Sequence, residues 1–184
     1  MVISQNISYA TRVINRGGVI AYPTEGVFGL GCLPDDFDAV ARILTIKKRD
    51  PDMGLVLIVS DVDQLDGWIG SQLDDGSLAS SLEAPVTWIV PSSEKVPWWI
   101  RGKHAGIAVR KTEHPVAKAL CEATDSALVS TSANVSGRPP ARTPFVLRRT
   151  LGTLVDYVVP GECGPAHGPS EIRILETGKI LRPA

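Results

Sequence analysis

The sequence carries almost no net charge. Its 184 residues include 19 Lys and Arg and 20 Asp and Glu, for a formal charge of -1. Proteins that bind nucleic acids without sequence preference do so through a strong positive field. This balance argues against such a global field, so any contact with RNA must be local.

Cysteine is scarce, and long apolar runs are missing. Cys32, Cys121 and Cys163 lie far apart and form neither a CxxC pair nor a disulfide framework, which is typical of a reducing compartment. The N-terminus has no signal-peptide pattern, and no run reaches the roughly 18 to 20 apolar residues of a membrane span. We therefore expect a cytoplasmic protein with no membrane association.

The common nucleotide motifs are also missing. Neither Gly102-Lys103 nor Gly178-Lys179 has the glycine and hydroxyl spacing of a P-loop, and no GxGxxG follows a predicted strand. A Walker-type ATPase is excluded, and the missing GxGxxG argues against a dinucleotide-binding domain. Three scattered histidines (His104, His114 and His167) predict no metal site, and we interpret them as structural or surface residues.

Hydrophobic periodicity predicts one α/β domain over residues 1–184. Strands are expected at residues 19–21, 55–59, 86–90, 107–109 and 127–129. Helices are expected from Phe37 to about Arg49 with Asp35 or Asp36 as cap, at residues 115–123, and at residues 144–151 with Thr143 as cap. A hairpin of residues 171–175 and 179–181 predicts a mixed sheet, and residues 71–81 predict a surface loop.

Three segments combine polar side chains with strand or helix ends. Thr24-Glu25-Gly26 follows the first strand, Lys47-Lys48-Arg49 closes the first helix, and residues 130–137 form a loop rich in hydroxyls. Turn formation alone would explain the Thr24-Glu25-Gly26 segment and the loop of residues 130–137, and the helix dipole would explain the cations. The alternative is anion binding, with Lys47 and Arg49 converging on a polyphosphate.

Arg110 follows the apolar strand of residues 106–109, so its guanidinium needs a partner at the sheet edge. Either a structural salt bridge or a carboxylate ligand would satisfy it.

In this order and spacing, the segments resemble the YrdC/TsaC family, the L-threonylcarbamoyladenylate synthases of tRNA modification, in their short bacterial form. The resemblance runs from about residue 15 to the C-terminus. It implies a twisted, open mixed α/β sheet with helices packed on it. The implied reaction joins L-threonine, bicarbonate or CO2, and ATP into threonylcarbamoyl-AMP and pyrophosphate, for N6-threonylcarbamoyladenosine in tRNAs that read ANN codons.

The resemblance also implies site residues, with Lys47 and Arg49 as the catalytic pair. It implies ATP contacts by Lys47, Arg49, Gly106, Ser132, Asn134, Pro140 and Ser170. It implies threonine contacts by Thr24, Gly26, Arg110 and Ser130. Mg2+ is expected to arrive with ATP, and a downstream tRNA threonylcarbamoyl transferase complex is expected as partner. Two departures from the family are Gly26, where many relatives have threonine, and Ile58, where relatives often have histidine.

Other functions remain open on the sequence. A non-catalytic RNA-binding factor would use Arg138, Arg142, Arg148 and Arg149, and Trp98-Trp99 could stack on bases or simply pack under a loop. A tRNA contact is compatible with either function. Carbamoyl transfer from carbamoyl phosphate, as in a related hydrogenase-maturation module, is a third possibility.

Overall fold

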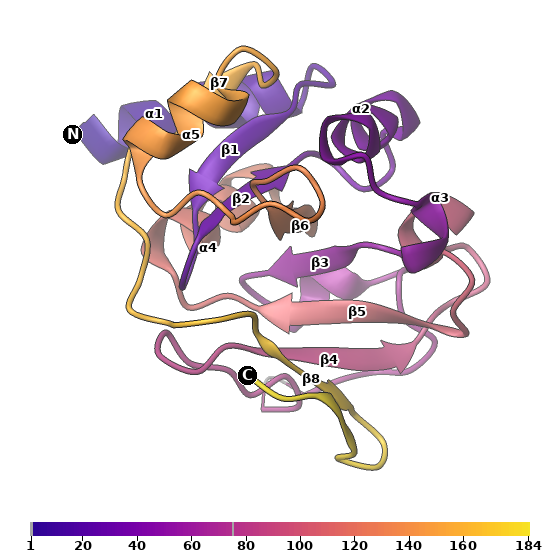
Figure 1. The fold of residues 1–184 in the computed structure, drawn as a ribbon. Helices are drawn as coiled ribbons and strands as arrows, with labels where there is room; N and C mark the ends of the chain where they lie inside the picture. The colour runs from indigo at the N-terminus through magenta and orange to yellow at the C-terminus, as the bar shows by residue number, and fades with distance from the viewer. Residues whose placement is uncertain (1, 75) are drawn as a thin grey trace.

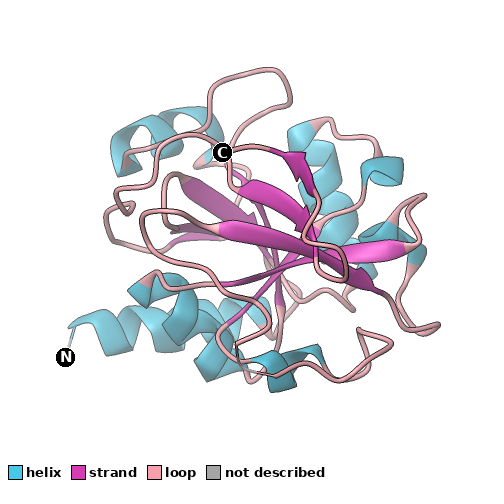
Figure 2. Ribbon diagram, turned by 90° about the horizontal axis from the view of Figure 1, so that it is seen from below, coloured by secondary structure: helices cyan, strands magenta, loops and turns pink. Residues whose placement is uncertain are grey.

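The computed structural model describes residues 2–74 and 76–184, which form one nine-stranded sheet with helices on both sides (Figures 1 and 2). The strand order is β7-β1-β2-β6-β3-β5-β4-β8-β9. The strands are β1 Ile20–Pro23, β2 Phe28–Gly31, β3 Val56–Val59, β4 Val86–Pro91, β5 Gly106–Lys111, β6 Leu128–Ser132, β7 Tyr157–Val158, β8 Glu171–Ile174 and β9 Ile180–Arg182. The α-helices are α1 Val2–Ile14, α2 Phe37–Lys47, α3 Trp98–Arg101, α4 Pro115–Thr124 and α5 Pro144–Leu151.

The sheet is mixed, which confirms the fold class expected from the sequence. Strand pairs β1–β7, β3–β5 and β4–β8 are parallel, and the other pairs are antiparallel. The predicted C-terminal hairpin is present as β8 and β9. Helix α5 has the predicted bounds, and the Oγ1 of its cap, Thr143, accepts a hydrogen bond from the N–H of Val146.

Strand alternation divides the apolar side chains between two cores. Ile20 and Tyr22 of β1 pack with α1 and α4 on one face, whereas Ala21 packs with α2 and α5 on the other. Helices α1 and α4 contact each other and β1. Beyond them, on the same face, β5 presents Ala108 and Arg110 to a cavity. The functional site therefore begins where this helical layer ends.

Strand β2 and the end of β6 differ from the sequence prediction. Residues 28–31 are not among the expected strands, but as β2 they pair with β1 and β6, and β6 continues through Ser132. Gly31 is required here, because a Cβ would lie 2.6 Å from the carbonyl oxygen of Val129 and 2.8 Å from the ring of Tyr22. Tertiary packing around a buried tyrosine thus makes a strand of a segment that no local pattern marks as one.

Other differences are smaller. The sequence prediction missed α1 and β7, and β5 continues to Lys111, so Arg110 lies inside the strand. Residue 75 lies outside the described residues; the rest of the 71–81 segment has neither helix nor strand, as expected, although Leu78 is fully buried. No helix among the described residues is long and apolar enough to span a membrane.

His114 caps α4 and couples its stability to pH. Its Nδ1 accepts the N–H of Val116 (3.3 Å), and its Nε2 lies 3.0 Å from the carbonyl oxygen of Glu162. Burial lowers the His114 pKa below its ordinary value. His114 therefore binds a proton more tightly in the unfolded chain than in the folded one. As a result, the free energy of unfolding must fall as the pH drops below about 6.5.

We expect His114→Asn, which keeps a capping acceptor without titrating, to lose less unfolding free energy than the wild type between pH 7 and pH 5. His114→Ala should cost about 1 kcal/mol at pH 7. Urea unfolding at both pH values measures these differences. Equal pH dependence in the wild type and the Asn variant would contradict this account.

Candidate functional site

Helices α1 and α4 cover only part of one face of the sheet, and a cavity of about 640 Å³ opens on the uncovered part of that same face. Its charge is strongly one-sided. Among the described residues that line it are four arginines and a single carboxylate, Glu25. The arginines are Arg49, Arg101, Arg110 and Arg182. A cavity this cationic in a protein of net charge -1 fits a ligand with several negative charges.

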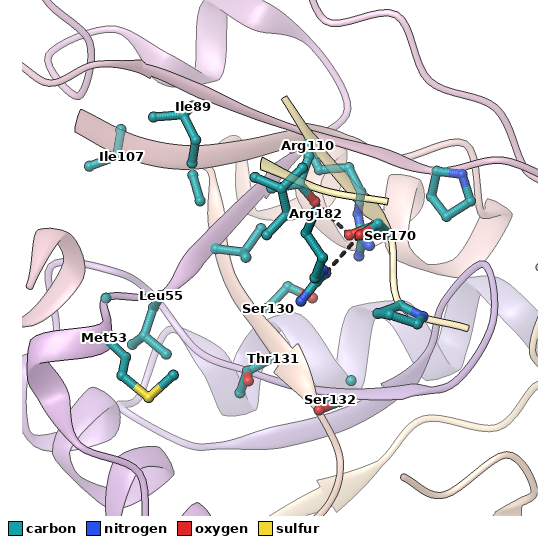
Figure 3. A pocket seen from close by; sticks show the side chains of 18 of the residues that line it. Met53, Leu55, Ile89, Ile107, Arg110, Ser130, Thr131, Ser132, Ser170 and Arg182 are labelled. Carbon is teal, nitrogen blue, oxygen red and sulfur yellow. Dashed lines mark hydrogen bonds between the residues drawn. The ribbon is translucent and has the colours of Figure 1, made fainter. Parts of the chain in front are cut away.

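Figure 3 shows how the lining residues divide. Met53, Leu55, Ile89 and Ile107 lie on one side, and Arg110, Ser170 and Arg182 on the other. One side of the cavity is thus apolar, and the other offers hydrogen-bond donors.

The end of α2 determines where Lys47 and Arg49 point. Lys48 adopts the left-handed conformation (φ 50°), and its N–H bonds to the carbonyl oxygens of Leu44 and Thr45. This cap ends the helix and turns the chain. The two cations that flank Lys48 have different hydrogen-bond partners, and their convergence on a polyphosphate stays a prediction.

Lys47 is buried and holds the loop after β6. Its Nζ donates to the carbonyl oxygen of Ser132, to the carbonyl oxygen of Asn134 (3.0 Å) and to Asn134 Oδ1 (2.9 Å). Ser132 Oγ lies farther away, at 3.4 Å. An ammonium group has three N–H donors, so these oxygens use them all. Burial, and secondarily the charge of Arg49, lower the Lys47 pKa to about 8.

Arg49 reaches the cavity wall. Its Nε and Nη2 donate to the carbonyl oxygen of Gly54, at 3.3 and 3.0 Å. Burial lowers its pKa from the ordinary value, but the guanidinium stays charged at neutral pH. Arg49 is therefore fixed beside the apolar side of the cavity, because Met53 and Leu55 flank Gly54 in the chain.

Glu25 and Arg110 form a buried pair at the other side. Arg110 Nη2 lies 3.6 Å from Glu25 Oε2, while Glu25 Oε1 accepts from Thr112 Oγ1 (2.6 Å) and from the N–H of Glu113 (3.2 Å). Burial alone would raise the Glu25 pKa, but the charge of Arg110 and these donors outweigh it, and the net shift is downward. The carboxylate is therefore ionised at neutral pH.

The segment of residues 160–170, here called the strap, runs from the β7 end of the sheet to β8 (Figure 1). Its residues Ala166, Gly168, Pro169 and Ser170 line one wall of the cavity. The N–H groups of Gly164 and Ala166 donate to the carbonyl oxygens of Thr24 and Glu25, both at 2.9 Å. A Cβ on Gly26 would lie 2.7 Å from the carbonyl oxygen of Ala166. The strap therefore leaves no room for a side chain at position 26.

Ser170 joins the strap to β4 and to the C-terminal strand. Its Oγ lies 2.8 Å from Thr87 Oγ1, and its carbonyl oxygen accepts from Arg182 Nη2 at 2.7 Å (Figure 3). No sequence motif had pointed to Arg182. Only the pairing of β8 with β4 and β9 brings it to the cavity.

The structure places most predicted site residues together. Those that line the cavity are Thr24, Gly26, Arg49, Gly106, Arg110, Ser130, Ser132 and Ser170. Lys47 and Asn134 lie behind the wall, and Pro140 is exposed and does not line it. Their contacts with a nucleotide stay predictions. Arg101, His104 and Arg182 line the cavity, although sequence reasoning gave them no role there.

The hydroxyl of Thr24 is already engaged. Its Oγ1 donates to the carbonyl oxygen of Val27 at 2.7 Å, so towards a ligand it is left with acceptor capacity. Across residues 2–74 and 76–184, no three His, Cys, Asp or Glu side chains gather into a metal site.

Comparison with known proteins agrees with this geometry. The Sua5/YciO/YrdC family model, described as telomere recombination, matches residues 12–184. The chain is 48% identical over 180 residues to threonylcarbamoyl-AMP synthase of Nitrosococcus oceani, covering 96% of each, and 44% identical over 182 residues to that of Coxiella burnetii, covering 97% of each. The chain belongs to the Sua5/YciO/YrdC family.

Solved structures of the family have the same fold. The structure of P. abyssi Sua5 complexed with L-threonine superposes with a TM-score of 0.85 at 28% identity, covering 96% of this chain and 53% of Sua5. This chain thus spans about half the length of Sua5. E. coli YciO superposes with a TM-score of 0.80 at 26% identity, covering 96% of this chain and 88% of YciO.

Both departures from the family pattern now have a structural setting. Gly26 faces the strap, whose close approach requires a glycine there. Ile58 is fully buried in the core under α1 and α4, outside the cavity. Any group that replaces the family's threonine hydroxyl or histidine must therefore come from other positions.

Lys47 makes the loop after β6 sensitive to alkaline pH. Burial lowers the Lys47 pKa to about 8, so the open loop, in which the amine is exposed, binds the proton more tightly than the closed loop. We therefore expect the amide protection of residues 132–138, corrected for intrinsic exchange, to rise as the pH increases through about 8. Hydrogen exchange measures this rise. Lys47→Met, which cannot titrate, should show no such pH dependence. Constant protection in the wild type across this range would contradict the role of Lys47.

Proposed function

We propose that this chain is an L-threonylcarbamoyladenylate synthase, a nucleotidyltransferase that condenses L-threonine, bicarbonate or CO2, and ATP into threonylcarbamoyl-AMP and pyrophosphate. The observation that carries the proposal is one cavity that is lined by four arginines but by a single carboxylate. It is large enough for a nucleotide and an amino acid together. The name shared by the relatives from Nitrosococcus and Coxiella supports the same reaction.

The apolar side of the cavity suits the nucleoside, and Arg49 suits the polyphosphate. A guanidinium offers two parallel N–H donors to phosphate oxygens. Ser132 lines the cavity at the end of β6, and its Oγ donates to Asn134 Oδ1 at 2.6 Å, in the loop that Lys47 fixes from behind. Under this proposal Lys47 positions the phosphate-binding loop, and Arg49 makes the direct contact.

Arg110 suits the carboxylate of threonine, because its guanidinium faces the cavity from within β5 and is 13% exposed. Ser130 lies on the same side of β6 as Ser132 and lines the cavity beside it. The L-threonine complex of P. abyssi Sua5 supports an amino-acid site in this fold.

The chemistry requires little from the protein beyond positioning and charge. Threonine and CO2 form a carbamate, an anion whose oxygen attacks the α-phosphorus of ATP as pyrophosphate leaves. The arginines would stabilise the charge on the leaving pyrophosphate. Mg2+ would enter as part of the Mg-ATP substrate and keep its waters, because the one lining carboxylate is already paired with Arg110.

The product would pass to a downstream tRNA threonylcarbamoyl transferase complex, and a tRNA contact is part of the proposal. Exposed arginines on α5, Arg148 and Arg149, lie outside the cavity and would serve such a contact. A purely RNA-binding protein would not need four arginines gathered inside one cavity. Trp99 packs inward, with its Nε1 donating to the carbonyl oxygen of Pro34, which agrees with the packing interpretation for Trp99, whereas Trp98 is exposed.

Arg49→Ala tests the phosphate role. We expect kcat/KM for ATP, measured as pyrophosphate release with threonine and bicarbonate saturating, to fall at least about tenfold. Arg148→Ala, which removes an exposed arginine on α5, is the matched control and should stay within about twofold. Equal activity in the two variants would refute the assignment of Arg49.

A further inference from the structure

Glu25 is a buried carboxylate that none of the roles above uses. It is 1% exposed and lines the cavity. Its Oε1 has two donors, from Thr112 and Glu113, but among the described residues its Oε2 accepts no hydrogen bond. An ionised carboxylate that is cut off from water needs a compensating charge, and Arg110 supplies it.

Arg110, the partner of Glu25, also has a buried polar atom without a hydrogen-bond partner. Three buried side-chain polar atoms of the described residues have no hydrogen-bond partner: Glu25 Oε2, Arg101 Nε and Arg110 Nε. All three residues line the cavity, and two of the atoms belong to this one pair. Buried polar groups normally find partners, so their clustering marks a place where the protein alone is incomplete.

The Glu25–Arg110 pair is neutral as a whole, which sets it apart from the other arginines of the cavity. A simple anion would be attracted by Arg110 and repelled by Glu25. An amino acid brings a carboxylate and, on the adjacent carbon, an ammonium group, so both charges of the pair would be matched. Discrimination of this kind depends on the repulsive element as much as on the attractive one.

We infer that Glu25 is a specificity-determining residue that makes the Arg110 side of the cavity select a zwitterionic amino acid over a simple carboxylate or phosphate. This inference rests on the proposed function and deepens it. It also explains how one cavity keeps its two substrates apart: without Glu25, Arg110 would be a second attractive site for the polyphosphate of ATP.

The test compares two ligands on the complete chain. Calorimetry gives the dissociation constants of L-threonine and of 3-hydroxybutanoate, which is threonine without its α-amino group. In Glu25→Gln, 3-hydroxybutanoate should bind more tightly relative to threonine, and the ratio of the two constants should shift by at least about tenfold. A displaced Arg110 would weaken both ligands alike and leave the ratio unchanged, which would overturn the inference.

Thr112→Val is the matched control, because it removes the 2.6 Å hydrogen bond to Oε1 but keeps the carboxylate charge. Its ratio should stay within about twofold of the wild type, and a shift as large as that of Glu25→Gln would assign the effect to hydrogen bonding instead.

The wild type tests the inference even if Glu25→Gln does not fold. There, 3-hydroxybutanoate should bind at least about tenfold more weakly than threonine, and equal affinities would overturn the inference. Pyrophosphate release from the same preparations reports the proposed function separately. Threonine binding with the expected selectivity but without release would refute the synthase and leave the role of Glu25 standing.

Discussion

Positive charge crowded into one cavity is the constraint on which the rest of the site depends. Four guanidinium groups repel one another and must be held in place while their donors stay available. The fold fixes two of them through backbone carbonyl groups, Arg49 on Gly54 and Arg182 on Ser170. Arg110 is instead paired with a buried carboxylate, and the Nε of Arg101 has no hydrogen-bond partner among the described residues. The excess of positive charge suits a polyphosphate, and the Glu25–Arg110 pair suits an amino acid.

The sheet supplies the geometry through simple alternation. On β5, Ala108 and Arg110 face the cavity, while Val109 is buried in the core on the other face of the sheet. Helices α1 and α4 cover only one part of this face, and the strap crosses at the other part. The cavity thus lies where neither helix covers the sheet, and the strands of the sheet hold the polar side chains that line it.

Local signals in the sequence predicted much of this. The cap at Thr143, the apolar strands and the C-terminal hairpin follow from short-range patterns, and the structure confirms them. Strand β2 could not be predicted, because its glycines are explained by the ring of Tyr22 on the neighbouring strand, a contact that no local pattern indicates. The inward turn of Lys47 and the position of Arg182 likewise depend on strand order, which no local motif encodes.

The most direct test of the account is to incubate the purified chain with Mg-ATP, L-threonine and ¹³C-labelled bicarbonate and to analyse the products by mass spectrometry. The account predicts an adenylate of threonine that carries one ¹³C atom, together with an equal amount of pyrophosphate, and neither product when threonine or bicarbonate is omitted. Pyrophosphate without the labelled adenylate, or no turnover while ATP and threonine both bind, would contradict it.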